Sequence, residues 1–365
     1  MHTMKFSLFF NLQLASPTPE KERHIIHDAV DQAVLAEELG YDGIWFVEHH
    51  GLYEYSHCSS PESMLAYIAA KTNRITLGHG ITLTPYRYNH PIRIAERVAM
   101  LDVLSNGRVI WGSGKSSSMT ELGAFENDIT MVHDQWLEAL EIIPQMWSEE
   151  VFEYYGRFFE IPPTQVIPKP VQAPHPPIVA ACSRRESAIL AGELGVGALN
   201  FAVGTPDDMR EKVDAYRQAV LGASPEYYEV NNHFACAPLT FCLDDDRKAV
   251  ELGWRGARFF EQGLATYFMS GTRPLGEIPV PRDPLTAEEL ESKMASRNSE
   301  AEALYLIGEP ARLIDTIATY EECGVDELIL VMQMGTIPLE EVRKSMSTFA
   351  EKVLPHVNRA ASVSV

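Results

Sequence analysis

The chain has 365 residues, of which 45% are hydrophobic and 22% are charged, a balance typical of a globular protein. Its 51 acidic residues outnumber the 30 basic ones and give a formal net charge of -21. A surface this acidic repels phosphate backbones and anionic membranes, which excludes nucleic acid and membranes as expected partners. The N-terminus lacks a signal-peptide pattern and no apolar run is long enough to cross a bilayer, so we expect a cytoplasmic protein.

Cysteine and histidine spacing gives no sign of a metal site. The five cysteines never form a C-x-x-C pair, so neither a disulfide framework nor a thiolate zinc site is indicated, and we expect buried, inert thiols. His24 and His27 lie three residues apart, but the nearest acidic residues do not complete a ligand triad. We therefore expect no metal.

The first half of the chain alternates short apolar runs with patterns of helical period. Strands are predicted over residues 5–10, 43–47, 74–83 and 108–112. Helices are predicted over residues 23–39, 61–71, 91–104 and 133–147. Each strand thus precedes a helix.

The second half continues this alternation. Strands are predicted over residues 178–181, 197–201, 235–242 and 327–331. Helices are predicted from about residue 184, after residue 206, over residues 245–267, and from residues 310 and 339. Eight strands that each precede a helix predict a parallel sheet, and eight is the number that closes a (β/α)8 TIM barrel. We predict one such α/β domain over residues 1–365, with an open doubly wound sheet as the alternative.

Two insertions interrupt the alternation. The first, residues 150–177 after strand four, contains an aromatic run that predicts a hairpin followed by a proline-braced loop. The second, residues 271–299 after strand seven, is rich in proline, charge and serine and has little hydrophobic period. Loops of this length are usually lids or disordered, so we expect a mobile lid or a disordered insertion there.

Glu48, His49 and His50 follow the second predicted strand. Active sites of such barrels lie at the carboxyl ends of the strands, histidine can transfer a proton near neutral pH, and Glu48 can orient an imidazole. Side chains of adjacent residues point in opposite directions, so we expect one histidine to face the cavity. A histidine that only caps the strand is equally compatible with the spacing alone.

A loop of glycine and serine, residues 112–118, follows strand four. It is not a nucleotide phosphate loop, because Val109 stands where that motif requires glycine. The loop contains Gly114 and Lys115 and is followed by Glu121. It either lets a ligand approach the backbone or faces solvent.

Two other strand ends are candidate ligand sites. Ser183, Arg184 and Ser187 open a helix after strand five, and a helix start with hydroxyls and arginines suits a phosphate, with Ser183 as N-cap. Capping without a ligand is the plain alternative. Gly80 and Ile81 end strand three, where glycine permits the close approach of a flat group or marks only a strand-end kink.

The substrate pocket is predicted from apolar strand residues together with Glu121. Most large apolar strand residues belong to the barrel core, and those near the strand ends are available to line a pocket, namely Phe10, Trp45, Trp111 and Met332. No G-x-G-x-x-G dinucleotide fingerprint is present, so we expect nicotinamide oxidation to occur on another protein.

These features together resemble the bacterial-luciferase-like flavin monooxygenases, in the branch with Glu-His-His after strand two. The resemblance extends from residue 4 to about residue 355 and is most specific in residues 43–50, 90–96, 101–108 and 324–328. It implies that His49 is the catalytic histidine, with Glu48 and His50 beside it. It also implies a non-prolyl cis peptide between Gly80 and Ile81, beneath the flavin ring.

The resemblance implies further cofactor contacts. Gly114 and Lys115 would contact the flavin, and the segment with Ser183, Arg184 and Ser187 would take its phosphate. Residues 271–299 would form the mobile lid. Luciferase itself has a reactive cysteine where this chain has Gly114, so we do not expect light emission, and lysine at 115 in place of an arginine weakens bidentate phosphate contact.

The resemblance implies a monooxygenase that receives reduced FMN, or FAD, from a separate NAD(P)H:flavin reductase. With O2 as co-substrate it would oxygenate a small apolar organic molecule through a flavin C4a-peroxide. Members of the family are commonly dimers, so the resemblance also implies a homodimer. Two alternatives remain open: a deazaflavin-dependent oxidoreductase of the same fold, and a protein that binds flavin without catalysis.

Overall fold

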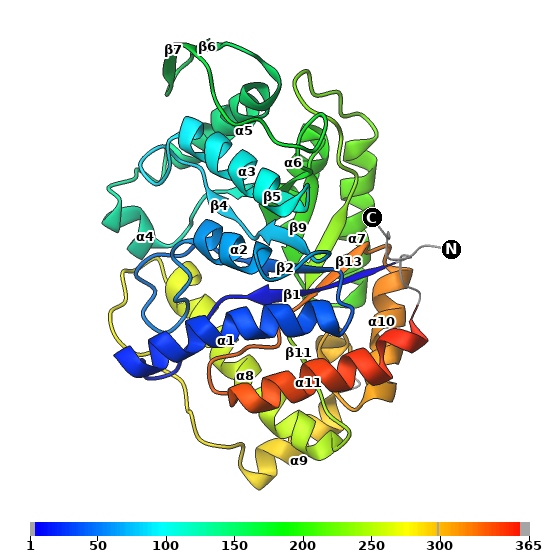
Figure 1. The fold of residues 1–365 in the computed structure, drawn as a ribbon. Coiled ribbons are helices and arrows are strands. Elements are labelled where there is room, and N and C mark those ends of the chain that lie inside the picture. The colour runs from blue at the N-terminus through cyan, green and yellow to red at the C-terminus, as the bar shows by residue number, and fades with distance from the viewer. Residues whose placement is uncertain (1–3, 298, 358–365) are drawn as a thin grey trace.

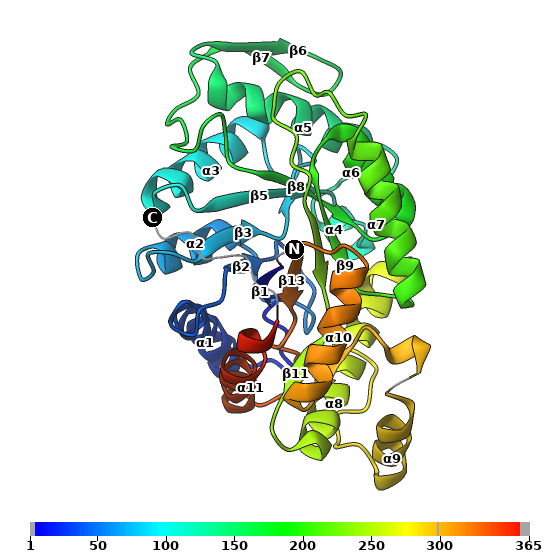
Figure 2. The same ribbon diagram turned by 90° about the vertical axis from the view of Figure 1, so that its right-hand side faces the viewer.

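The computed structural model describes residues 4–297 and 299–357, which form a barrel of parallel strands surrounded by helices (Figures 1 and 2). In order around the barrel the strands are β1 (Lys5–Phe10), β2 (Gly43–Phe46), β3 (Thr76–His79), β5 (Val109–Gly114), β8 (Ile178–Cys182), β9 (Gly197–Phe201), β10 (Phe234–Ala237) and β13 (Glu327–Leu330). The ring is closed because β13 pairs with β1 and β3 pairs with β5. The predicted TIM barrel is confirmed, and the open sheet is excluded.

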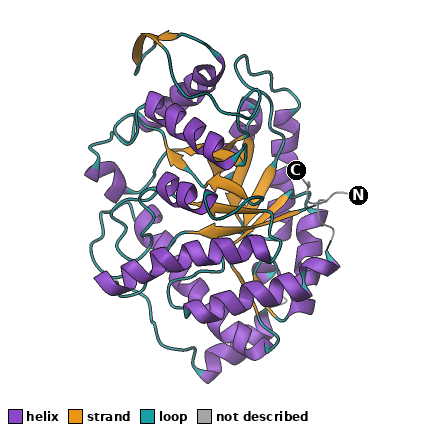
Figure 3. Cartoon of the chain, in the orientation of Figure 1, coloured by secondary structure: helices purple, strands orange, loops and turns teal. Residues whose placement is uncertain are grey.

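Long helices cover the outside of the barrel (Figure 3). They are α1 (Pro19–Glu38), α2 (Pro61–Ala69), α3 (Pro91–Ser105), α5 (Val132–Ser148), α6 (Arg185–Leu194), α7 (Pro206–Val220), α8 (Asp246–Leu264), α10 (Pro310–Glu322) and α11 (Leu339–Lys352). Each predicted helix is present. Helix α1 begins earlier than predicted because Thr18 accepts the Lys21 N–H as N-cap and proline occupies the first turn.

Two predicted strands are each divided in two. The third becomes β3 and β4 (Thr82–Leu83), separated by a cis peptide between Gly80 and Ile81. The seventh becomes β10 and β11 (Thr240–Cys242). Strand β11 leaves the barrel sheet and pairs in parallel with a short unpredicted strand, β12 (Leu306–Gly308).

The two insertions differ in how well the sequence predicts them. The first forms the predicted hairpin, in which β6 (Phe152–Tyr155) pairs antiparallel with β7 (Glu160–Thr164). The second contains a helix that was not predicted, α9 (Ala287–Ser296), which begins with a capping box between Thr286 and Glu289. In both views the hairpin and α9 lie at opposite ends of the molecule (Figures 1 and 2).

The other unpredicted elements are α4 (Met119–Ala124), the π-helical turn η1 (Ala265–Met269), η2 (Glu300–Glu302) and η3 (Leu354–His356).

Within residues 4–297 and 299–357, no helix is long and apolar enough to span a membrane. The same residues hold no group of three or more side chains able to bind a metal ion.

The barrel interior contains a buried carboxylate. Ser7 on β1 and Trp45 on β2 face inward and donate to Oε1 of Glu327 on β13, at 2.5 and 3.0 Å. The other carboxylate oxygen lies 2.8 Å from His233 Nε2. Burial raises the pKa of Glu327, but the hydrogen bond and charge of His233 and the two donors outweigh burial and lower the pKa to about 2.

Glu327→Gln should lower the free energy of unfolding by about 3 kcal/mol at pH 7, because His233 loses its carboxylate partner in the barrel interior. A lowered carboxyl pKa stabilises the folded state above the unfolded pKa of 4.5, and this contribution is lost as the pH falls toward 2. Urea unfolding should therefore give a smaller difference at pH 3 than at pH 7. Glu291→Gln, on an exposed carboxylate, should change stability by less than about 0.5 kcal/mol. A difference independent of pH would contradict an ionised Glu327.

Candidate active site

The first histidine after β2 forms a pair with a buried carboxylate. His49 Nδ1 lies 3.0 Å from Oε1 of Glu121, a fully buried side chain on α4. The same oxygen accepts the His50 backbone N–H at 2.8 Å, and the other oxygen accepts the Ser116 hydroxyl. Glu121 therefore joins the loop after β2 to the loop after β5.

This pairing assigns a hydrogen to one nitrogen of the His49 ring. Burial raises the pKa of Glu121, but His49, the Ser116 hydroxyl and the His50 N–H outweigh burial, and the pKa is lowered. An ionised carboxylate only accepts hydrogen bonds, so His49 Nδ1 carries a hydrogen. No residue in the described part of the chain hydrogen-bonds to Nε2. In the neutral ring, Nε2 is therefore a free acceptor.

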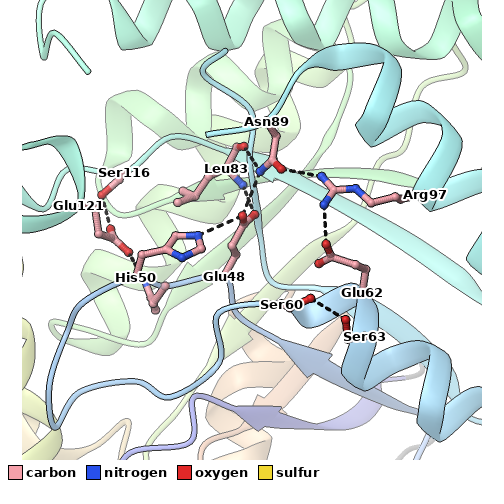
Figure 4. Close-up of polar contacts among 11 residues, drawn as sticks. Glu48, His50, Ser60, Glu62, Ser63, Leu83, Asn89, Arg97, Ser116 and Glu121 are labelled. Atoms are coloured by element: carbon pink, nitrogen blue, oxygen red, sulfur yellow. Dashed lines mark hydrogen bonds and ion pairs between the residues drawn. The ribbon is translucent and has the colours of Figure 1, made fainter. Parts of the chain in front are cut away.

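The ring of the second histidine contacts a different carboxylate, Glu48, although its backbone N–H also donates to Glu121 (Figure 4). His50 Nε2 lies 3.3 Å from Glu48 Oε1, which also accepts the Asn89 amide at 2.9 Å. Glu48 Oε2 accepts the Leu83 N–H at 2.7 Å, and Arg97 donates to Asn89 Oδ1 at 2.6 Å. Burial lowers the pKa of His50, but the hydrogen bond and charge of Glu48 outweigh it, and the pKa is raised. Glu48 thus orients His50, whereas Glu121 orients His49.

The two histidines face different aromatic groups. The His49 ring centroid lies 5.6 Å from that of Tyr55 and 5.5 Å from that of Phe268, which belongs to η1. The His50 ring lies 4.8 Å from Phe125. The lining beside Tyr55 continues into the barrel through Phe260, Phe201 and Phe9.

Two glycines lie at the ends of the strands that follow β2. Gly80 and Ile81 form the predicted cis peptide. Strand β4 pairs with β5 so that Leu83 lies opposite Gly114. A Cβ on Gly114 would come 2.9 Å from Cδ1 of Ile81, so Gly114 packs closely on the side chain of the cis peptide. Gly80 and Ile81 are partly exposed, so a flat ring could lie against their backbone, as the flavin assignment requires.

Two cations gather where the cofactor phosphate is predicted. Lys115 follows β5 and Arg184 follows β8, and these strands pair with Ser113 opposite Ala180. The Lys115 side chain is exposed; partial desolvation and then the charge of Arg184 lower its pKa, and the charge of Asp134 opposes them. Neither forms an ion pair with any residue that the structure describes. Their chemistry fits a phosphate.

The start of α6 differs from the prediction in one detail. Arg184 is the N-cap, so Ser183 lies one residue before the N-cap. The Ser187 hydroxyl is engaged locally, because it accepts the Arg184 N–H at 3.0 Å and donates to the Arg184 carbonyl at 2.7 Å. The backbone N–H groups of the first turn remain the donors best suited to a phosphate.

Three residues assigned to the substrate pocket face the outer helices or the neighbouring strand instead. Phe10 stacks on a phenylalanine of β2 at 4.6 Å, Trp111 packs on a tryptophan of α5 at 5.3 Å, and the Met332 sulfur lies 4.0 Å from a serine hydroxyl of α11. Strand alternation is the reason, since inward positions go to neighbours such as Phe9. Trp45 does face inward, but it is 1% exposed and lies beneath Gly80.

Several residues near His49 were not predicted. Ser116 and Tyr55 lie in loops, and Phe268 lies in the π-helical turn after α8. Glu121 was predicted, but as a pocket residue and not as the partner of His49. The one signal that the sequence offers for Ser116 and Tyr55 is their position soon after a barrel strand, where active-site loops lie.

Known proteins are similar to this chain over most of its length. The luciferase-like monooxygenase family matches residues 4–327. The chain is 24% identical over 362 residues to the oxygenase component of a flavin-dependent trigonelline monooxygenase of Acinetobacter baylyi, covering 96% of this chain and 95% of that one. It is 28% identical over 337 residues to an F420-dependent glucose-6-phosphate dehydrogenase of Amycolatopsis mediterranei, covering 90% and 93%. The solved structure of the monooxygenase RslO1 from Streptomyces bottropensis matches with a TM-score of 0.80 and 25% identity, covering 97% of this chain and 99% of that one. The chain therefore belongs to the luciferase-like monooxygenase family.

Proposed function

We propose that this protein is the oxygenase of a two-component flavin-dependent monooxygenase. It would take reduced FMN from a separate reductase and use O2 to oxygenate a small apolar organic molecule. The observation that supports this proposal is the His49–Glu121 pair, which lies at the same barrel end as the partly exposed Gly80–Ile81 cis peptide and the cations of Lys115 and Arg184. A relative named as an oxygenase component supports the division into two proteins.

The chain would bind the cofactor through groups at three strand ends. Lys115, Arg184 and the N–H groups of the first turn of α6 would hold the phosphate. The backbone at Gly80 and Gly114 would lie against the ring. Reduced flavin supplies the electrons with which O2 is activated, and the protein determines where protons go.

His49 is the residue best suited to move a proton. Its Nδ1–H is held by Glu121, which fixes the orientation of the ring and leaves Nε2 as the nitrogen that can exchange a proton. This nitrogen would accept a proton from the reacting centre or return one to it. The rings of Tyr55 and Phe268 would keep water away from it.

A second candidate function is hydride transfer with a deazaflavin, which the dehydrogenase relative favours. Anaerobic titration with reduced FMN and with a reduced deazaflavin, followed by ¹⁸O₂ and a panel of aldehydes, ketones and terpenoids, separates the two. Monooxygenation requires tighter binding of reduced FMN and one ¹⁸O atom in the product. Preferential binding of the deazaflavin with substrate reduction or oxidation and no oxygen uptake would replace the proposal. Tight flavin binding without either reaction would indicate a binding protein.

Lys115→Gln and Arg184→Gln should each weaken FMN binding about tenfold, or ~1.4 kcal/mol, because each removes a cation from the phosphate site. Riboflavin affinity should stay constant, since riboflavin has no phosphate. Quenching of flavin fluorescence at fixed ionic strength measures the affinity for FMN and the affinity for riboflavin. Arg247→Gln, on an exposed arginine of α8, is the control. An equal loss for FMN and riboflavin would assign the two cations a role other than phosphate binding.

His49→Asn should lower the rate of product formation by about 10²- to 10⁴-fold, the usual range for a general acid or base. FMN affinity should change little, because the phosphate and platform residues remain. Single-turnover assays with chemically reduced FMN measure the rate, and His24→Asn, on an exposed position of α1, is the control. Product formation at the normal rate would remove the role assigned to His49.

Glu48→Gln should lower the pKa of His50, because the carboxylate stabilises the imidazolium through a hydrogen bond and its charge. NMR titration of the His50 ring proton, assigned with His50→Asn, measures the midpoint. Glu126→Gln changes a carboxylate whose side chain is 81% exposed and should not change the midpoint of His50. An unchanged midpoint in Glu48→Gln would mean that other groups set the charge of His50.

A further inference from the structure

Residues 271–282, which we call the strap, are fastened to the loop that follows His50. Glu54 in that loop is fully buried and accepts both terminal nitrogens of Arg282, at 2.6 and 3.0 Å. It also accepts the backbone N–H groups of Ile278 and Ser16, at 2.6 and 2.5 Å. One carboxylate thus ties together the loops after β1 and β2 and the strap, although Glu54 and Arg282 are 228 positions apart in the chain.

The strap packs an apolar side chain behind the ring that contacts His49. Ile278 is 1% exposed and belongs to a cluster with Leu52, Tyr55, Phe259 and Tyr267. Tyr55 in turn lies edge-on to His49, with ring centroids 5.6 Å apart. One wall of the His49 site is therefore backed by the strap.

The beginning of the strap lies on the helix that carries the partner of His49. A Cβ on Gly123 of α4 would come 2.5 Å from Cζ of Arg273, so the Arg273 guanidinium rests directly on this helix. Glu121 lies in the same short helix. Figure 1 shows the strap in yellow as it runs from the neighbourhood of α4 toward α9. The strap therefore contacts the supports of both Tyr55 and Glu121.

We propose that the Glu54–Arg282 ion pair is a clasp that positions His49. By fastening the strap, it holds Tyr55 against one side of the His49 ring and steadies the helix that supplies Glu121. Glu54 and Arg282 contact neither His49 nor the residues assigned to the flavin, so they are positioning residues. The expected effect on catalysis rests on the proposed function, whereas the effect on the geometry of His49 does not.

The burial of Glu54 gives the clasp its strength. Burial raises the pKa of this carboxyl, but Arg282 and the Ser16 and Ile278 N–H groups outweigh burial and lower it. A buried carboxylate that loses its arginine keeps a desolvated charge without a counter-ion, which is strongly unfavourable. Opening the strap is therefore coupled to solvating Glu54.

The chain offers a matched control in a second ion pair that reaches the same insertion. Arg247 of α8 pairs with Glu291 of α9, but their side chains are 55% and 64% exposed. Exposed pairs contribute little to stability. Arg247→Gln therefore removes the same kind of side chain from an ion pair with the insertion without disturbing a buried charge.

The test compares Arg282→Gln, Arg282→Lys, Arg247→Gln and wild type in the full chain. The NMR shift of the His49 ring proton reports its distance from the rings of Tyr55 and Phe268. Limited digestion with a glutamate-specific protease reports how firmly the strap is held, because Glu277 lies in the strap, is exposed and is present in every variant. We expect Arg282→Gln to move the His49 signal, to speed cleavage of the strap, and to lower kcat about tenfold by misplacing the histidine, with KM less affected. Arg282→Lys should bring the His49 signal, the rate of strap cleavage and kcat part of the way back to the wild-type values. Arg247→Gln should behave as wild type.

Two results would overturn the clasp. An unchanged rate of strap cleavage in Arg282→Gln would show that Arg282 does not fasten the strap, and an unmoved His49 signal with a loosened strap would show that the strap does not position the site. The double variant Glu54→Gln with Arg282→Gln removes both charges and repeats the readouts without an unpaired buried carboxylate. If the wild type itself fails to oxygenate any substrate, the proposed function fails, and the NMR and cleavage results still decide the clasp.

Discussion

The hydrogen bond between His49 and Glu121 connects the loops of two barrel strands, β2 and β5, that are not neighbours in the sheet. Strand β3 lies between them, so the carboxylate reaches across the end of that strand. One side chain thereby fixes the His49 ring, holds the His50 backbone and accepts the Ser116 hydroxyl. Together with the contacts of Glu48 and Glu54, this connection holds the loop after β2 in place.

Buried carboxylates recur wherever this structure needs a fixed geometry. Glu327 holds the barrel interior together, Glu121 holds the loops after β2 and β5, and Glu54 holds the strap. In each case burial raises the pKa of the carboxyl group, but its hydrogen-bond and charge partners outweigh burial and lower the pKa. Such a group is costly to expose or to leave half-paired, so it specifies one arrangement more sharply than an apolar contact of the same size.

The sequence predicts the barrel well because alternating strands and helices are a local pattern with a simple geometric consequence. It also predicts the place of His49, since a residue after a barrel strand lies at the mouth whatever its partners are. It fails for Phe10 and Trp111, because inward and outward positions alternate and a shift of one residue reverses the assignment. The partnership of Glu121 with His49 is a contact over 72 residues, which no local pattern encodes. Helix α9 is not predicted, because its segment has little apolar periodicity. The sequence does contain one signal for it, since Thr286 and Glu289 fit the capping-box pattern of a helix start.

The lining of the mouth, more than the cofactor site, bears on which reaction this chain performs. A flat ring platform and cations for an anionic tail recognise what FMN and a deazaflavin have in common, and a histidine held by a carboxylate serves either reaction. The groups around His49 are more selective. Phe268 and Phe201 are partly exposed and apolar, whereas Tyr55 and Phe260 are buried, and this favours the proposed apolar substrate over a hydroxylated or phosphorylated one. Such a substrate would have little from which a hydride is readily removed, and its oxygenation would need water kept away from the proton on His49.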